Sequence, residues 1–139
     1  MELTEVHPLF VHFPIALLSV GYFFDVLYIV FKKTELESAG WWNLCIGMVS
    51  SFFNILTGFI ADWDYGHFEN PFPIWDTHGS TQLLSVFLFI ILFVWRWKLD
   101  KKIPETMSTM ITYFILGACS VGLLFYGGHL GAVLAGRVG

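Results

Sequence analysis

The chain has 139 residues, of which 56% are hydrophobic and 13% charged, and its formal net charge is −4. Soluble domains average roughly 25% charged residues, so this composition indicates a chain whose solvent is lipid. Acidity and a membrane location together exclude nucleic-acid binding. The length indicates one domain, residues 1–139. Cys45 and Cys119 fall inside apolar runs, where small packing residues are expected rather than a disulfide or a metal site.

Four apolar runs are long enough to cross a bilayer, and they cover about 9–31, 40–61, 78–94 and 107–126. The first run lacks the basic region and the small-residue cleavage site of a signal peptide. Gly127 and Gly128 are expected to loosen the end of the fourth. Because short connections join antiparallel neighbours, the sequence predicts an all-α integral membrane four-helix bundle with up-down-up-down topology.

The positive charges predict the orientation of the bundle. Only Arg137 lies outside the first and third connections, which hold the other Lys and Arg residues: Lys32, Lys33, Arg96, Lys98, Lys101 and Lys102. The positive-inside rule places these connections in the cytoplasm. In a bacterial inner membrane, both termini and the long second connection would then face outward.

The histidines all fall on the predicted outer side. They are His7 and His12 at the start of the first span, His67 in the outer loop, His78 at the start of the third span, and His129 after the fourth. A bundle core could bring His12, His78 and His129 together, because they lie at one depth on three helices. Pro14 removes a helical hydrogen bond and allows a bend beside His12.

Imidazole binds haem iron or a divalent metal while neutral, so it is less costly in a membrane than a carboxylate. One hypothesis is therefore a b-type haem held chiefly by His12 and His78, with His129 as a further ligand or neighbour. A second is a transition-metal ion (Zn, Cu or Fe) among His7, His12, Asp62, His78 and His129. A third is that no cofactor binds and these side chains are polar caps. The chain has no His-x-x-x-His or Cys-x-x-Cys motif, so any site must be assembled from different helices.

Asp25 lies within the first span, about two-thirds of the way inward. A carboxylate at that depth is costly unless it is paired or neutral. Asn54 is the nearest polar residue by depth, and Tyr22 and Tyr28 are other candidate partners. Asp25 is therefore either a hydrogen-bonded structural carboxyl or part of a proton relay.

The opening His-Pro-Leu-Phe-Val-His-Phe-Pro-Ile-Ala-Leu-Leu, residues 7–18, is followed by further matching residues: Asp25, Gly58, Asp62, His78, Gly127, Gly128 and Leu130. This pattern resembles the uncharacterised bacterial membrane-protein family known as domain of unknown function 2231. The resemblance implies a four-helix membrane protein with cytochrome or iron–sulfur partners. The tail after Leu130 departs from the family pattern, which leaves any role for it open.

These observations predict a membrane-embedded redox or electron-transfer subunit that contacts the lipid bilayer and a cytochrome or iron–sulfur partner. The alternatives are a non-haem metal-binding membrane protein and a cofactor-free structural subunit of a larger complex. The sequence holds no Ser/His/Asp arrangement, phosphate-binding loop or dedicated nucleophile, which argues against an independent enzyme. Homo-oligomerisation stays open.

Overall fold

The structure is a computed structural model that describes the backbone of residues 3–65, 78–134 and 136, and the side chains of residues 10–60, 78–133 and 136. It contains the helices α1 (Leu3–Phe31), α2 (Thr34–Tyr65), α3 (His78–Lys98) and α4 (Met107–Leu134). Within the described residues there is no strand. The predicted all-α class is confirmed.

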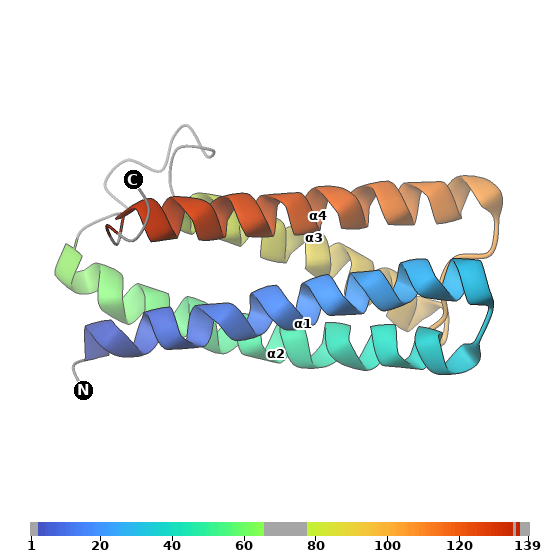
Figure 1. Ribbon diagram of the computed structural model, residues 1–139, viewed down its shortest axis with the longest axis horizontal. Coiled ribbons are helices and arrows are strands. Elements are labelled where there is room, and N and C mark those ends of the chain that lie inside the picture. The colour runs from blue at the N-terminus through green and yellow to red at the C-terminus, as the bar shows by residue number, and fades with distance from the viewer. Residues whose placement is uncertain (1–2, 66–77, 135, 137–139) are drawn as a thin grey trace.

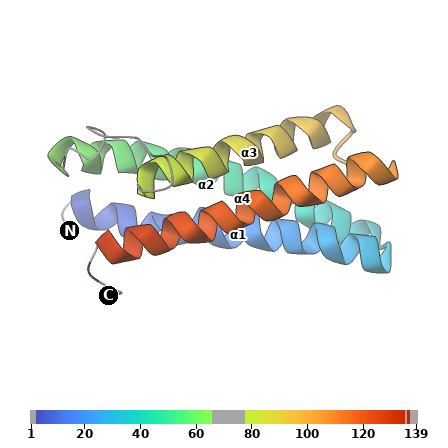
Figure 2. The same cartoon turned by 90° about the horizontal axis from the view of Figure 1, so that it is seen from above.

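The helices lie side by side in an antiparallel bundle, with both chain termini at one end (Figure 1). α1 packs on α2 and α3 packs on α4, so the chain forms two helical hairpins. The hairpins meet through α1 against α4 and α2 against α3, as the view from above shows (Figure 2). This is the predicted up-down-up-down arrangement.

All four helices are long and apolar enough to cross a membrane, over Phe10–Phe31, Thr34–Ile60, His78–Lys98 and Met107–Val133. The outer surface carries large apolar side chains, among them Phe23, Phe52, Phe87 and Phe125, each more than half exposed. An apolar surface of this extent is unfavourable in water and favourable in lipid. The middle of the bundle therefore contacts the lipid bilayer.

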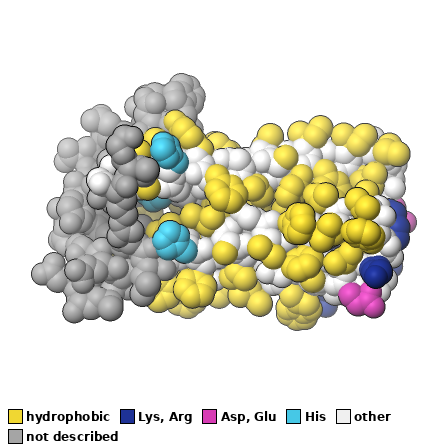
Figure 3. Space-filling view, in the orientation of Figure 1, with side chains coloured by type: hydrophobic (Ala, Val, Ile, Leu, Met, Phe, Trp, Pro, Cys, Tyr) yellow, Lys and Arg dark blue, Asp and Glu magenta, His cyan; other side chains and the backbone are white. Residues whose placement is uncertain are grey.

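The two ends of the bundle differ in chemistry (Figure 3). We call the end with the short α1–α2 and α3–α4 connections the lysine end; its exposed basic residues are Lys32, Lys33, Lys98, Lys101 and Lys102. We call the opposite end, where the termini lie, the histidine end; its histidines with described side chains are His12, His78 and His129. The short connections use left-handed backbone at Lys32, Asp100 and Lys101, with φ of 54°, 53° and 71°. Such residues end helices and reverse the chain within a few positions.

The glycines at the end of α4 do not loosen it, as the sequence suggested, because the helix continues to Leu134. They instead permit close packing. A Cβ at Gly127 would lie 2.9 Å from Gln82 Nε2, and one at Gly131 would lie 2.8 Å from the His78 ring. A Cβ at Gly128 would lie 3.3 Å from the Cδ1 atom of Ile15. This stretch of α4 therefore admits side chains of both α3 and α1. α1 is also one continuous helix, which includes Pro8 and Pro14.

Candidate functional site

The described part of the bundle contains a buried ion pair near the lysine end. Arg96 Nη1 donates to Asp25 Oδ1 at 2.7 Å, and the two side chains are 0% and 4% exposed. Tyr113 donates its hydroxyl to the other carboxylate oxygen, Oδ2, at 2.7 Å. Asp25 belongs to α1, Arg96 to α3 and Tyr113 to α4, so one carboxylate joins three helices.

Arg96 also fixes the backbone around it. Its Nη2 donates to the carbonyl oxygens of Glu37 at 3.0 Å and Lys101 at 2.8 Å, and Nε donates to Lys101 at 3.2 Å. Four of its five N–H donors are therefore used within the protein. The guanidinium also lies 5.7 Å from the ring centroid of Trp41, within reach of a cation–π interaction. With Glu37 and Trp41 on α2, the cluster reaches all four helices.

This cluster corrects two sequence predictions. Arg96 was placed in the third connection, on the cytoplasmic side, yet it belongs to α3 and its side chain is fully buried in the bundle. Asn54, Tyr22 and Tyr28 were the candidate partners of Asp25, and the structure gives Arg96 and Tyr113 instead. Depth estimated along one helix does not show which side chains of the neighbouring helices point inward. The sequence feature that could have suggested Arg96 as the partner of Asp25 was its position at the inner end of the third span, two residues before Lys98.

Three side chains of α3 donate to backbone carbonyls of α4 at regular intervals, and we call them the α3–α4 ladder. His78 Nδ1 donates to Gly127 O at 2.5 Å, and Gln82 Nε2 donates to Leu124 O at 3.2 Å. Ser85 Oγ donates to Ser120 O at 2.7 Å. Because a carbonyl can only accept, the first bond requires the proton of His78 on Nδ1, so a neutral ring carries its lone pair on Nε2.

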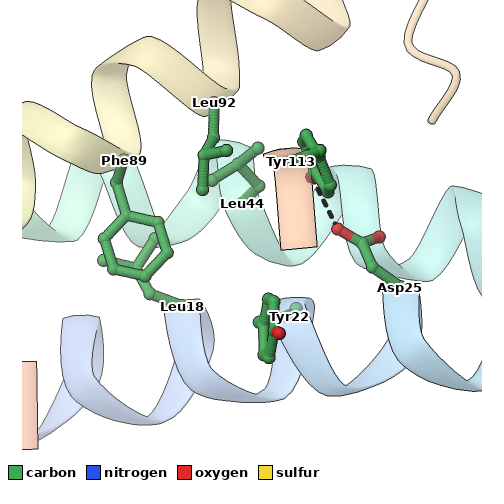
Figure 4. A pocket seen from close by; sticks show the side chains of 8 residues that line it. Leu18, Tyr22, Asp25, Leu44, Phe89, Leu92 and Tyr113 are labelled. Atoms are coloured by element: carbon green, nitrogen blue, oxygen red, sulfur yellow. Dashed lines mark hydrogen bonds between the residues drawn. The ribbon is translucent and has the colours of Figure 1, made fainter. Parts of the chain in front are cut away.

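A small cavity lies beside the Asp25 carboxylate, among side chains of all four helices (Figure 4). Tyr22, Asp25 and Tyr113 form its polar side, and its apolar lining is Leu18, Gly21, Leu44, Phe89 and Leu92. It has room for about one water molecule. The Tyr22 hydroxyl donates to Phe114 O at 2.9 Å, beside the Asp25 cluster.

The predicted ligand residues whose side chains the structure describes all lie at the histidine end. His78 is half-buried against α4, whereas the side chains of His12 and His129 are exposed. The side chains of His7 and Asp62 and all of His67 lie outside the described residues. Among the side chains that are described, no three His, Cys, Asp or Glu residues are grouped so as to hold a metal ion. The five-residue ligand set therefore stays a prediction.

Helix register nevertheless supports a common level for His12 and His78. Ile15 of α1 lies against Gly128 of α4, and the His78 ring lies against Gly131. α1 and α4 are antiparallel, so moving three residues back along α1 and three forward along α4 is about the same displacement. Together with the contact of Tyr22 on Gly117, the register places His12 at the level of Gly127 to Gly131, the stretch of α4 on which His78 packs.

A family model described as "Predicted membrane protein (DUF2231)" matches residues 4–139. Neither the curated proteins nor the solved structures include a match to the chain. The match covers nearly the whole sequence, including all four helices and both the ion pair and the histidine end.

Proposed function

The chain belongs to the DUF2231 family of membrane proteins, and we propose that it is a membrane-embedded electron-transfer subunit that binds a b-type haem at its histidine end. His78 and His12 would hold the haem iron through their imidazoles, with His129 as a neighbour. A cytochrome or an iron–sulfur protein would supply or accept the electron on the side of the membrane that this end faces.

The observation that carries the proposal is the fixed orientation of His78. Its Nδ1 donates to the carbonyl of Gly127. Its ring packs on Gly131 of α4, in the space that a side chain at that position would fill. Metal-ligating histidines commonly donate their other ring nitrogen to a backbone carbonyl, which fixes the tautomer and the direction of the ligand atom. In His78 the proton on Nδ1 leaves the lone pair on Nε2, and Nε2 is the atom that would bind the iron.

The available donors favour haem over a protein-ligated metal ion. A structural or catalytic zinc site takes three or four protein ligands. The described side chains offer no group of three such residues, so a non-haem site would need ligands from the parts of the chain that are not described. A haem takes its remaining iron ligands from the porphyrin and needs only two imidazoles from the protein, and His12 and His78 share a level.

The orientation is part of the same proposal. The exposed lysines gather at one end of the bundle, and the positive-inside rule places that end in the bacterial cytoplasm. Reporter fusions at Thr34 and Asp100 should then report a cytoplasmic location, and a fusion at Asn70 an outer one. A cytoplasmic signal at Asn70 would contradict the outer placement of the histidine end.

The haem prediction is tested by the absorption spectrum of protein purified from membranes of cells supplied with a haem precursor. We expect a Soret band that shifts on reduction, and we expect it to be lost in His78→Ala and in His12→Ala. His67→Ala, a histidine outside the predicted ligand set, should keep the band. A wild-type protein without the band would contradict the haem proposal, and stoichiometric metal in that protein would support the non-haem alternative.

A further inference from the structure

The outer surface of α3 carries a shallow groove near the lysine end. Its lining is Ile90, Ile91, Val94, Trp95 and Lys98. Positions 90, 94 and 98 follow one another at intervals of four residues, as do 91 and 95, so these side chains share one face of the helix. The groove has a volume of about 410 Å³ and is open to the surroundings. Ligand pockets measure roughly 300–1,000 Å³, so the groove can hold a large part of a small molecule.

The groove is apolar over most of its length. Ile90, Ile91 and Val94 are 42%, 38% and 43% exposed, and they belong to the surface that contacts lipid. Between Ile90 and Lys98 the helix rises about 12 Å. One leaflet of the hydrocarbon core, half of the whole, is about 15 Å thick. The groove therefore runs along most of one leaflet, in the direction that an acyl chain takes.

Trp95 and Lys98 lie at the end of the groove that is nearer the lysine end. The Trp95 ring packs edge-on against Tyr113 of α4, with ring centroids 6.0 Å apart, so this wall of the groove is held in place. Tryptophan favours the membrane interface, and a lysine near a helix end extends its ammonium group to the same level. Among the described residues no carboxylate pairs with Lys98. Its charge is therefore available to an external anion.

We propose that this groove binds an anionic phospholipid, with an acyl chain along Ile90, Ile91 and Val94 and the headgroup phosphate at Lys98. Charge complementarity selects the occupant. A zwitterionic lipid carries its own cation beside the phosphate, whereas an anionic lipid leaves the phosphate charge to the lysine, and basic side chains next to a membrane span attract such headgroups. A second copy of the chain would cover the apolar part of the groove but would bring no anion to Lys98.

The test is native mass spectrometry of the full chain in detergent, titrated with phosphatidylglycerol or with phosphatidylcholine of the same acyl chains. We expect the first phosphatidylglycerol to bind about fivefold more tightly, which corresponds to roughly 1 kcal/mol for one lysine near an anionic headgroup. Lys98→Gln should remove this preference. Lys33→Gln, which neutralises an exposed lysine of the α1–α2 connection, should keep it. Equal binding of the two lipids by wild type, or a preference that survives in Lys98→Gln, would overturn the proposal.

A second variant fills the groove and leaves every charge in place. Val94→Trp puts a large side chain one helical turn before Lys98, at an exposed position where the interior of the bundle is not disturbed. We expect it to weaken phosphatidylglycerol binding to the level of phosphatidylcholine. Val49→Trp is the matched control, because Val49 is an exposed valine of α2 away from the groove, and it should bind like wild type.

Two results with these variants would also overturn the proposal. If Val94→Trp bound phosphatidylglycerol like wild type, the charge of Lys98 would act without the groove. If the wild-type spectrum showed a dimer that Val94→Trp dissociates, the groove would hold a second copy of the chain. The measurement is made in detergent and needs no haem, so it is independent of the electron-transfer proposal and of the orientation of the bundle.

Discussion

Replacing Arg96 with Met is expected to destabilise the bundle by about 3–5 kcal/mol, the usual cost of leaving one charge of a buried pair without its partner. Asp25 would keep only the Tyr113 hydroxyl, and the carbonyl of Glu37 would lose its guanidinium donor. The measurement is unfolding of the purified protein in detergent, followed by far-ultraviolet circular dichroism.

The control for this prediction is Lys98→Met, which removes a positive charge from an exposed position of the same helix, two residues away. Exposed charges contribute roughly 0–1 kcal/mol, so this variant should unfold almost like wild type. Equal losses in the two variants would mean that Arg96 acts only as a surface charge. The lysine end would then not depend on the ion pair.

Gly40→Ala is expected to have the second large effect. A Cβ at this position would lie 2.0 Å from Asp25 Oδ1 and 3.2 Å from the carbonyl oxygen of Gly21. The carboxylate cannot simply turn away, because Arg96 and Tyr113 hold both of its oxygens. Overpacking of this kind costs about 1–3 kcal/mol, and we expect the loss to appear in the same unfolding measurement.

Gly122→Ala is the matched control for this substitution. A Cβ there would meet no atom within 4 Å, so the change should only improve helix propensity, by up to about 1 kcal/mol. If Gly40→Ala proved as stable as Gly122→Ala, the carboxylate would have to lie elsewhere than beside Gly40. The contacts of Asp25 described above would then be wrong.

The four membrane-crossing helices could be predicted from sequence because the length and hydropathy of a span reflect the thickness of the bilayer. Helix ends were harder to predict. Gly127 and Gly128 suggested the end of the fourth span, but each makes room for a side chain of another helix, and α4 continues to Leu134. A glycine that breaks a helix and a glycine that permits close packing look the same in one sequence.

Asp25 could be recognised as a special residue because a carboxylate inside an apolar span needs a partner. Its partner could not be identified, since the positive-inside rule accounts for basic residues at span ends without distinguishing buried from exposed ones. Arg96 and Lys98 are two positions apart on α3, yet only Arg96 is buried. Which one faces the core depends on the rotation of α3, and this is set by packing against its neighbours.

The histidine end was predicted from topology alone. The structure adds the hydrogen bond from His78 to Gly127 and the exposure of His12 and His129. Neither could be predicted from the sequence, because the spacing of residues along the chain does not show which side chains of different helices meet. The Gly-Gly pair was noted, but its use as a packing surface for α3 and α1 became visible only in the fold.

The account depends most on the claim that Asp25 and Arg96 act as one pair that joins the two hairpins. A double-mutant cycle with Asp25→Asn, Arg96→Gln and the combined variant measures this directly. We expect each single variant to be clearly destabilised in detergent unfolding, and the combined variant to be more stable than the sum of the two losses implies, because neither charge is then left alone. Losses that simply add would contradict the pairing and the structural role assigned to it.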